Sequence, residues 1–455
     1  MFATTFKQAA TTTHRPMTAG LNGALGESST GHASIDFNNT VIQSYTDQKM
    51  LLDEVNKVLA INDPEQAHEL IATILNKRYP RGGEGCKEVF WKTFLILYEK
   101  FPQTMLEFVP HIPNIGCFKD YWQILLLINT KEKNNSMYDY TPTSSESIRF
   151  YDFYAPLVER IAESFTETLK NDIEAVKTFE STYTTDDERK ANLNKLTISL
   201  AGKWAPSEKG SFNKNVHVYI RLSDSTNTSS TSPKTTRLYK QSLTHYLART
   251  MFLPGTLKRF TSTNLPPSLP TQVLKEWRLS KSLLDKYLEV PEVFMAANEF
   301  SHINLKKATS TFMFKARLAL LNEKKKVPLQ AHEAETGNRH PDNEDRVKCR
   351  QMFLGNLSKM KGATLSLAQL YKKFIVARSI TEKKVLEAQF NAKVKETEKQ
   401  FRAYKQDLIN KLTAQLESAK SPEDVERLTK SVELAKAYAK QGCLPVCDVS
   451  GSMTC

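Results

Sequence analysis

The sequence predicts an all-α protein in which helices repeat along the chain. Glycine is scarce, at 16 of 455 residues, while 40% of the residues are hydrophobic. This composition favours helices over a β-sandwich. From about Val41 onward, apolar residues recur at three- and four-residue spacing. Turn signals interrupt this pattern at intervals of roughly 20 residues, which is typical of an α-solenoid. No clean sequence repeat accompanies the rhythm.

Helix start signals and polar breaks place the elements within residues 37–380. Asp63-Pro64-Glu65 supplies a capping side chain and then a proline in the first helical turn. Further helices are expected through residues 70–75, 90–97, 150–202 and 271–323. Loops are expected near residues 131–147, 222–236 and 324–345, with a proline-rich break at 261–270.

A long helical hairpin is predicted over residues 381–441. Residues 381–419 contain neither proline nor glycine, and their apolar positions lie on one face of a helix about 55 Å long. Ser421-Pro422-Glu423-Asp424 then starts a second helix with a cap, a proline and acids in the first turn. We expect the two helices to fold back on each other, as in a coiled coil.

The composition also excludes several classes of protein. Residues 1–36 contain no apolar segment of signal-peptide type and are predicted to be a mobile arm. A transit peptide is the weaker interpretation, because Lys7 and Arg15 are the only Lys or Arg residues there. The longest apolar run, residues 124–128, is too short to cross a membrane. The six cysteines form no Cys-x-x-Cys pair, so neither zinc nor a disulfide framework is implied. We expect a cytoplasmic location, with a nuclear or virion-associated location as the alternative. Secretion is not expected.

The net charge of +13 and the pI of about 9.2 permit binding to RNA or to another anionic surface. The alternative is a basic surface that only water covers. Lys77, Arg78 and Arg81 flank a glycine-rich turn that precedes a helix, where backbone amides can bind phosphate. A simple linker between helices is the other interpretation. The turn lacks the Gly-Lys-Ser/Thr of a P-loop, which argues against nucleotide hydrolysis.

Two other basic clusters are candidates for RNA contacts. Lys203 and Trp204 would combine a phosphate contact with base stacking, although the tryptophan would equally serve as a packing residue. The second cluster contains Arg237, Lys240, His245 and Arg249, which are predicted to lie on one helix. They would form a basic stripe that binds RNA, or only a solvated face of that helix. The histidines and acids show no catalytic grouping, so the chain is not expected to be an enzyme.

The last residues contain a motif for a hard cation. After the short apolar segment 444–447, Asp448, Ser450 and Ser452 offer one carboxylate and two hydroxyls in a tight turn, which suits Mg²⁺ or another divalent cation. A strand followed by this turn is typical of the start of a von Willebrand A domain, so residues 442–455 are interpreted as its first strand and metal-site turn. The later ligands are missing from this chain, and we expect the site to be unoccupied in it.

Six stretches, taken in order, carry a wider resemblance. They are Asn22-Gly23-Ala24, residues 78–85 (similar to Arg-x-x-Arg-Gly-Gly-x-Gly), residues 115–120 (similar to Tyr-Gly-x-Trp-x-Asp), residues 201–208 (containing Lys-Trp-x-Pro), residues 288–292 and residues 444–453. Together they resemble the uncharacterised TROVE-like family of plants, protists and large DNA viruses, whose distant relatives include the Ro autoantigen. In this family a helical module precedes a von Willebrand A domain, and the present chain resembles a form truncated just after the Asp-x-Ser-x-Ser motif.

The resemblance implies a ring of HEAT-like helix pairs with a basic, RNA-binding surface. It therefore implies a non-enzymatic RNA-binding scaffold that binds single-stranded or structured small RNA and no membrane. The alternative is a protein-interaction module that acts through the hairpin and the metal-dependent von Willebrand A site, without a nucleic-acid role.

Overall fold

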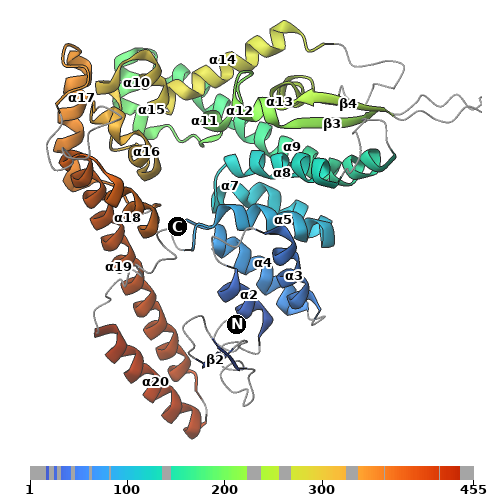
Figure 1. The fold of residues 1–455 in the computed structure, drawn as a ribbon, viewed down its shortest axis with the longest axis vertical. Coiled ribbons are helices and arrows are strands. Elements are labelled where there is room, and N and C mark those ends of the chain that lie inside the picture. The colour runs from blue at the N-terminus through green and yellow to red at the C-terminus, as the bar shows by residue number, and fades with distance from the viewer. Residues whose placement is uncertain are drawn as a thin grey trace, which may run out of the picture. The chain divides into compact units, whose positions relative to one another are not determined.

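The computed structural model describes residues 17–19, 25–27, 32–41, 47–60, 64–80, 83–135, 145–222, 237–255, 268–323, 337–362, 364–419 and 421–440. It separates into two compact units, Met1–Leu288 and Glu289–Cys455. Both units are mostly helical, which confirms the predicted helical fold class (Figure 1). The division falls within the segment predicted as one helical module. The expected strand and metal-site turn at 442–455 lie outside the described residues, as does most of the expected N-terminal arm. In that arm, β1 (Met17–Ala19) pairs antiparallel with β2 (Leu25–Glu27).

The first unit begins with a group of helices whose apolar faces pack on one another. Asp47 caps the second of them by accepting a hydrogen bond from the amide of Met50 at 2.9 Å, and the next helix begins at Pro64, as predicted. Val55 and Phe90 are among the fully buried side chains of this group. The helices are α2 (Ala33–Thr40), α3 (Gln48–Leu59), α4 (Pro64–Arg78), α5 (Lys87–Lys100), α6 (Pro102–Phe108), η1 (Val109–His111), α7 (Ile112–Ile115) and α8 (Lys119–Asn135).

The long helix α9 (Ser145–Thr182) organises the rest of this unit. It contacts α8, and it also contacts helices that come much later in the chain. Phe165 of α9 packs edge-to-face on Trp122 of α8, with 4.7 Å between ring centroids. The elements that follow it are α10 (Asp186–Asn192), η2 (Leu193–Lys195), α11 (Ala201–Trp204), α12 (Ser211–Asn215), β3 (His217–Leu222), β4 (Arg237–Ser242), α13 (Leu243–Phe252) and α14 (Thr271–Tyr287).

The antiparallel hairpin of β3 and β4 corrects one prediction. Arg237 and Lys240 lie on strand β4, whereas His245 and Arg249 lie on α13, so the four residues do not share one helix. The strands pair in a register that places His217 opposite Ser242. The segments on either side of the polar stretch 223–236 are short and only partly alternating. Pairing between them favours the strand, and no helical period competes over so few residues.

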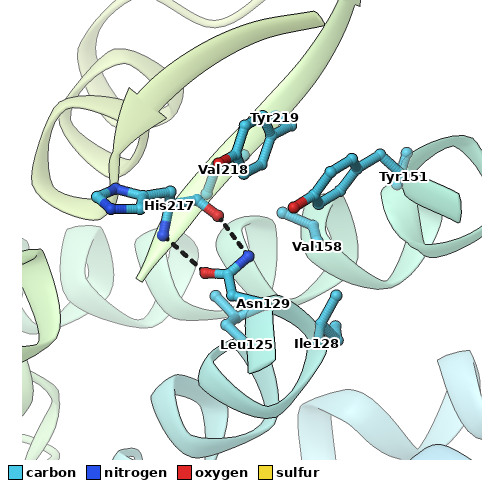
Figure 2. A pocket seen from close by; sticks show the side chains of 9 residues that line it. Leu125, Ile128, Asn129, Tyr151, Val158, His217, Val218 and Tyr219 are labelled. Carbon is cyan, nitrogen blue, oxygen red and sulfur yellow. Dashed lines mark hydrogen bonds between the residues drawn. The ribbon is translucent and has the colours of Figure 1, made fainter. Parts of the chain in front are cut away.

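An asparagine fixes β3 to the helical layer (Figure 2). The Asn129 side chain of α8 donates from Nδ2 to the His217 carbonyl at 3.0 Å, and its Oδ1 accepts from the His217 amide at 2.8 Å. Beside this contact, Tyr151 of α9 stacks on Tyr219 of β3 with 4.2 Å between centroids. These side chains line a small hollow between α8, α9 and β3. The amide satisfies both backbone groups of the first residue of the strand, and this fixes where the hairpin begins.

The second unit contains the predicted long helices. Its elements are α15 (Pro291–Ala297), η4 (Phe300–His302), α16 (Ser310–Leu320), α17 (Glu344–Gly355), η6 (Leu357–Lys359), α18 (Leu367–Val376), α19 (Ile380–Glu417) and α20 (Pro422–Lys440). Helices α19 and α20 pack along each other, as expected (Figure 1). Ser421 caps α20, since its Oγ accepts from the Asp424 amide at 3.1 Å. The core includes Leu320, Phe353 and Val385, all fully buried.

Two buried ion-paired groups fix α19 against the helices before it. Glu382, in the first turn of α19, accepts from Arg317 of α16, with 2.6 Å between Nη2 and Oε1. The cap residue of α19, Ser379, donates from Oγ to Glu323 at 2.8 Å. Arg350 of α17 lies 3.5 Å from the same glutamate. Because these groups are almost fully buried, each charge depends on its partner for stability. Among the described helices, none has the length and apolar character needed to cross a membrane.

The asparagine contact leads to a stability prediction. Asn129→Ala removes two hydrogen bonds to the backbone of His217, and it should lower the free energy of unfolding by about 2 kcal/mol, because a typical intramolecular bond contributes about 1 kcal/mol. Urea denaturation followed by circular dichroism measures this loss. Asn391→Ala, at an exposed position of α19, is the matched control and should change little. Equal losses for the two variants would contradict the assigned role.

Candidate nucleic-acid interface

A buried ion pair joins two of the sequence motifs. Arg78 ends α4, and Asp120 lies in the first turn of α8. The Arg78 Nε and Nη2 atoms donate to Asp120 Oδ2 at 2.9 and 2.7 Å. The other carboxylate oxygen accepts from Trp91 Nε1 at 2.8 Å, and the Cys117 amide donates to Oδ2 at 2.9 Å. Both charged side chains are at most 2% exposed. The carboxylate is therefore fully bonded to protein groups, as a buried charge must be.

The neighbouring Lys77 is also buried, and it pairs with a carboxylate that is itself partly exposed. Lys77 Nζ donates to the Asn38 carbonyl at 2.9 Å and to Glu84 Oε1 at 2.9 Å. Glu84 belongs to the glycine-rich turn, which folds back so that the Gly83 amide donates to the Tyr79 carbonyl at 3.1 Å. A Cβ on Gly83 would lie 1.8 Å from the Asn76 carbonyl oxygen, so this close approach requires glycine.

These contacts correct the expected role of Lys77 and Arg78. Both side chains are buried and paired, and neither is available to a phosphate at the surface. The described part of the turn bonds back to the end of α4 and leads into α5, which agrees with the alternative interpretation as a linker between helices. The third candidate in this turn, Arg81, lies outside the described residues.

Gly116 allows the Arg78–Asp120 pair to sit against the backbone of the second motif. A Cβ at Gly116 would lie 2.0 Å from Asp120 Oδ2 and 2.8 Å from Arg78 Cζ. The spacing of Gly116 and Asp120 within residues 115–120 thus has a direct steric cause. The sequence contains both motifs, but nothing in it indicates that Arg78 is the partner of Asp120.

Two tryptophans hold the Lys-Trp-x-Pro segment against the same region. Trp122, two residues after Asp120, donates from Nε1 to the Trp204 carbonyl at 2.8 Å. Trp277 of α14 donates from Nε1 to the Pro206 carbonyl at 3.1 Å. At Gly202 a Cβ would lie 2.5 Å from the Leu284 Cβ, so α11 and α14 are in close contact. The backbone of this segment is fixed from both sides, while the Lys203 and Trp204 side chains remain half-buried.

The convergence of the three motifs leaves cationic and aromatic groups near the surface. The Lys119 ammonium, next to Asp120, lies 6.0 Å from the Trp204 ring centroid and 5.8 Å from that of Phe212. Lysine over an aromatic ring makes a favourable cation–π contact. Burial is the largest cause that lowers the pKa of Lys87; the charges of Arg78 and Lys119 also lower it, while Cys117 and Asp120 act in the opposite direction. We call Lys87, Lys119, Lys203, Trp204 and Phe212 the lysine–aromatic cluster.

The remaining predicted RNA contacts are dispersed. Lys240 is exposed on β4, and Arg249 is buried in α13, where burial lowers its pKa. For Arg237 the structure describes the strand but not the side chain. The sequence reasoning missed Lys87, Lys119 and Phe212, although Lys119 lies inside a quoted motif. The sequence does contain one clue to Lys119. It precedes Asp120, and a residue next to a buried one on a helix lies on a different face.

The predicted metal ligands Asp448, Ser450 and Ser452 lie outside the described residues. Within the described part of the chain, no three His, Cys, Asp or Glu side chains are grouped as a metal site. The thiols near the Arg78–Asp120 pair are poor nucleophiles. Burial raises the pKa of Cys86 to about 11, with Glu84 adding to the shift. Burial and the nearby Asp120 also raise the pKa of Cys117. Both thiols therefore stay protonated at neutral pH.

The buried ion pair should respond strongly to the loss of one partner. Asp120→Ala leaves Arg78 buried without a counter-charge, and we expect the free energy of unfolding to fall by about 3–5 kcal/mol. Chemical denaturation measures the change. Glu426→Ala is the matched control, because it removes one member of the exposed Lys430–Glu426 pair, and it should scarcely move the midpoint. A small effect of Asp120→Ala would contradict the structure.

Gly116→Ala tests the close approach separately from the charge. The added methyl must displace the carboxylate of Asp120 or the guanidinium of Arg78, and overpacking of this kind costs about 1–3 kcal/mol. Gly355→Ala, at a position where a Cβ would meet nothing within 4 Å, is the control and should be neutral or slightly stabilising. Thermal unfolding compares the two variants, and equal midpoints would show that the space at Gly116 is not restricted.

A family model described as a domain of unknown function, DUF2828, matches residues 141–400, which is more than half of the chain. No curated protein matches the chain, and no solved structure matches it. The matched range includes Lys203, Trp204 and Phe212 of the lysine–aromatic cluster, whereas the Arg78–Asp120 pair precedes it. The model's description names neither TROVE nor von Willebrand A, so that resemblance stays a prediction. On this match, the chain belongs to the DUF2828 family.

Proposed function

We propose that the chain is a non-enzymatic RNA-binding scaffold of the TROVE and von Willebrand A type, and that the first unit contacts RNA through the lysine–aromatic cluster. The observation that carries the proposal is the position of Lys119, whose ammonium lies about equally far from the rings of Trp204 and Phe212. Lysines supply phosphate contacts, and partly exposed aromatic rings supply stacking platforms for unpaired bases.

The fixed backbone beneath the cluster favours binding over a merely solvated surface. The Arg78–Asp120 pair positions Lys119 at the start of α8, and Trp122 fixes the backbone at Trp204 from the same helix. A preorganised surface loses less conformational entropy when a ligand binds. A phosphate at this surface would be attracted by the charges of Lys87, Lys119 and Lys203.

The remaining parts of the proposal concern residues beyond the cluster. In the full-length family, Asp448, Ser450 and Ser452 would contribute to an Mg²⁺ site that binds a carboxylate of a protein partner. Their carboxylate and hydroxyl oxygens suit a hard cation. We place this scaffold in the cytoplasm. The exposed Lys240 of β4 would add a further phosphate contact.

Salt-dependent RNA binding tests the proposal. A fluorescein-labelled 20-nucleotide oligo(U) is titrated with the whole chain at KCl concentrations from 50 to 300 mM, and binding is followed by anisotropy. The affinity should fall steeply as salt rises. The Lys119→Gln/Lys203→Gln variant should reduce the slope of log K against log salt by about 1.4, since each contact to a single strand contributes about 0.7.

A matched variant separates a local site from general charge. Lys395→Gln/Lys399→Gln removes the same charge from exposed positions of α19 and should leave the slope unchanged. Trp204→Leu should weaken binding by roughly 5- to 100-fold through lost stacking. Circular dichroism confirms that each variant is folded. No binding of oligo(U) at 50 mM KCl, or an equal effect of both lysine pairs, would overturn the proposal.

A further inference from the structure

Helix α18 (Leu367–Val376) is apolar on two faces. Leu370 and Ala377 point into the core of the second unit and are 1% and 5% exposed. On another face, Tyr371, Phe374 and Ile375 are 36%, 38% and 53% exposed. These three positions have the spacing that places side chains next to each other on a helix. A helix that is apolar on more than one face is normally buried on all of them, so the outer face of α18 is suited to a partner.

Two more exposed apolar side chains occur at the end of α18 and shortly after it. Val376 is 59% exposed, and Ile380 at the start of α19 is 36% exposed. Single exposed apolar side chains are ordinary, but a contiguous group of large ones marks an interaction site. We call Tyr371, Phe374, Ile375, Val376 and Ile380 the α18 patch.

The charge around the α18 patch is mostly positive. Lysines and arginines are frequent between residues 357 and 384: Lys359, Lys361, Lys372, Lys373, Arg378, Lys383 and Lys384. Lys383 Nζ lies 5.8 Å from the Phe374 ring centroid, which places this cation at the edge of the patch. The one acid in the segment, Glu382, is buried and paired with Arg317. Glu387, one turn further along α19, is the first exposed acid after these cations, so residues 357–387 carry more exposed cations than exposed acids.

The chemistry of the patch favours a protein partner over a nucleic acid. Three of the five side chains of the patch, Ile375, Val376 and Ile380, are branched aliphatic groups that cannot stack on bases, whereas Tyr371 and Phe374 can pack against either kind of partner. An amphipathic helix can bury its apolar side chains against such a surface while its polar residues face the rim. The rim is basic, so acidic residues on the incoming helix would be attracted and basic ones repelled.

We propose that the α18 patch binds an acidic amphipathic helix of a protein partner. The leucine-like side chains of that helix would cover Phe374, Ile375 and Val376, and its carboxylates would pair with Lys373, Lys383 and Lys384. This site lies on different residues from the lysine–aromatic cluster and does not depend on the RNA-binding proposal. It overlaps the predicted hairpin only at the start of α19, where Ile380, Lys383 and Lys384 lie.

A displayed peptide library tests the proposal and does not require the partner to be identified first. The library consists of 18-residue amphipathic helices with leucines at the i, i+3, i+4 and i+7 positions, and with Glu, Gln or Lys at the polar positions. It is selected against the immobilised whole chain, and the strongest binder is then measured by anisotropy as a free peptide. We expect enrichment of Glu over Lys, and a loss of affinity of at least tenfold with Ile375→Ser/Val376→Ser or with Lys373→Glu/Lys383→Glu.

Controls distinguish binding at this site from adhesion to any exposed apolar side chain. Leu279→Ser changes an equally exposed apolar residue of α14 and should leave binding unchanged. Circular dichroism shows whether the α18 variants are folded. If the apolar variant does not fold, the lysine variant, which alters only polar groups, provides the test. Enrichment of Lys-rich helices, or an equal loss with Leu279→Ser, would overturn the proposal. The proposal would also fail if no Glu-rich helix is selected and the patch binds something else. Such binding, to vesicles of phosphatidylcholine and phosphatidylserine, to oligo(U) or to a second copy of the chain, would be lost with Ile375→Ser.

Discussion

The buried pair of Arg78 and Asp120 is the interaction on which the first unit depends. It joins the end of α4 to the start of α8, two elements that are separated by more than 40 positions in the chain. Desolvation makes two buried charges costly, and only the short hydrogen bonds between them and to Trp91 and the Cys117 amide offset that cost. The close packing at Gly116 leaves the pair one position. From there Lys119 and Trp122, on either side of Asp120 in α8, extend to the segment of Trp204.

The same physics separates the charges that stabilise the fold from those that can bind a ligand. Three cations, Lys77, Arg78 and Arg317, are buried beside carboxylates. The net charge of the chain does not distinguish them from cations at the surface. Lys119 and Lys383 instead lie over aromatic rings near the surface. The number of Lys and Arg residues in the sequence is therefore only an upper limit on the number of cations that can bind a ligand. Each unit has an exposed or half-exposed cationic and apolar surface among its described residues, and the two surfaces differ in character. The first consists of lysines and aromatic rings, whereas the second adds the branched aliphatic side chains of Ile375, Val376 and Ile380 to its aromatic rings and cations.

Most of the helical architecture follows from local signals in the sequence. The cap at Ser421, the start at Pro64 and the long run without proline or glycine before Glu417 all predict elements that the structure contains. The hairpin of β3 and β4 was missed, because six-residue strands carry little periodicity and their pairing is not local. The candidate site was predicted only in part. Its motifs are visible in the sequence, but whether a lysine or arginine is buried depends on a partner far along the chain. That is why Lys77 and Arg78 were assigned to the surface and Lys119 was overlooked.

A double-mutant cycle on Arg78 and Asp120 tests the central interaction most directly. The free energy of unfolding is measured for Arg78→Met, for Asp120→Leu and for the two changes together. If the charges are buried and depend on each other, each single variant leaves an isolated buried charge, and the double variant should be more stable than either one, with a coupling energy of about 2 kcal/mol or more. Additive losses, with the double variant the least stable of the three, would show that the two side chains do not form the buried pair that fixes the start of α8.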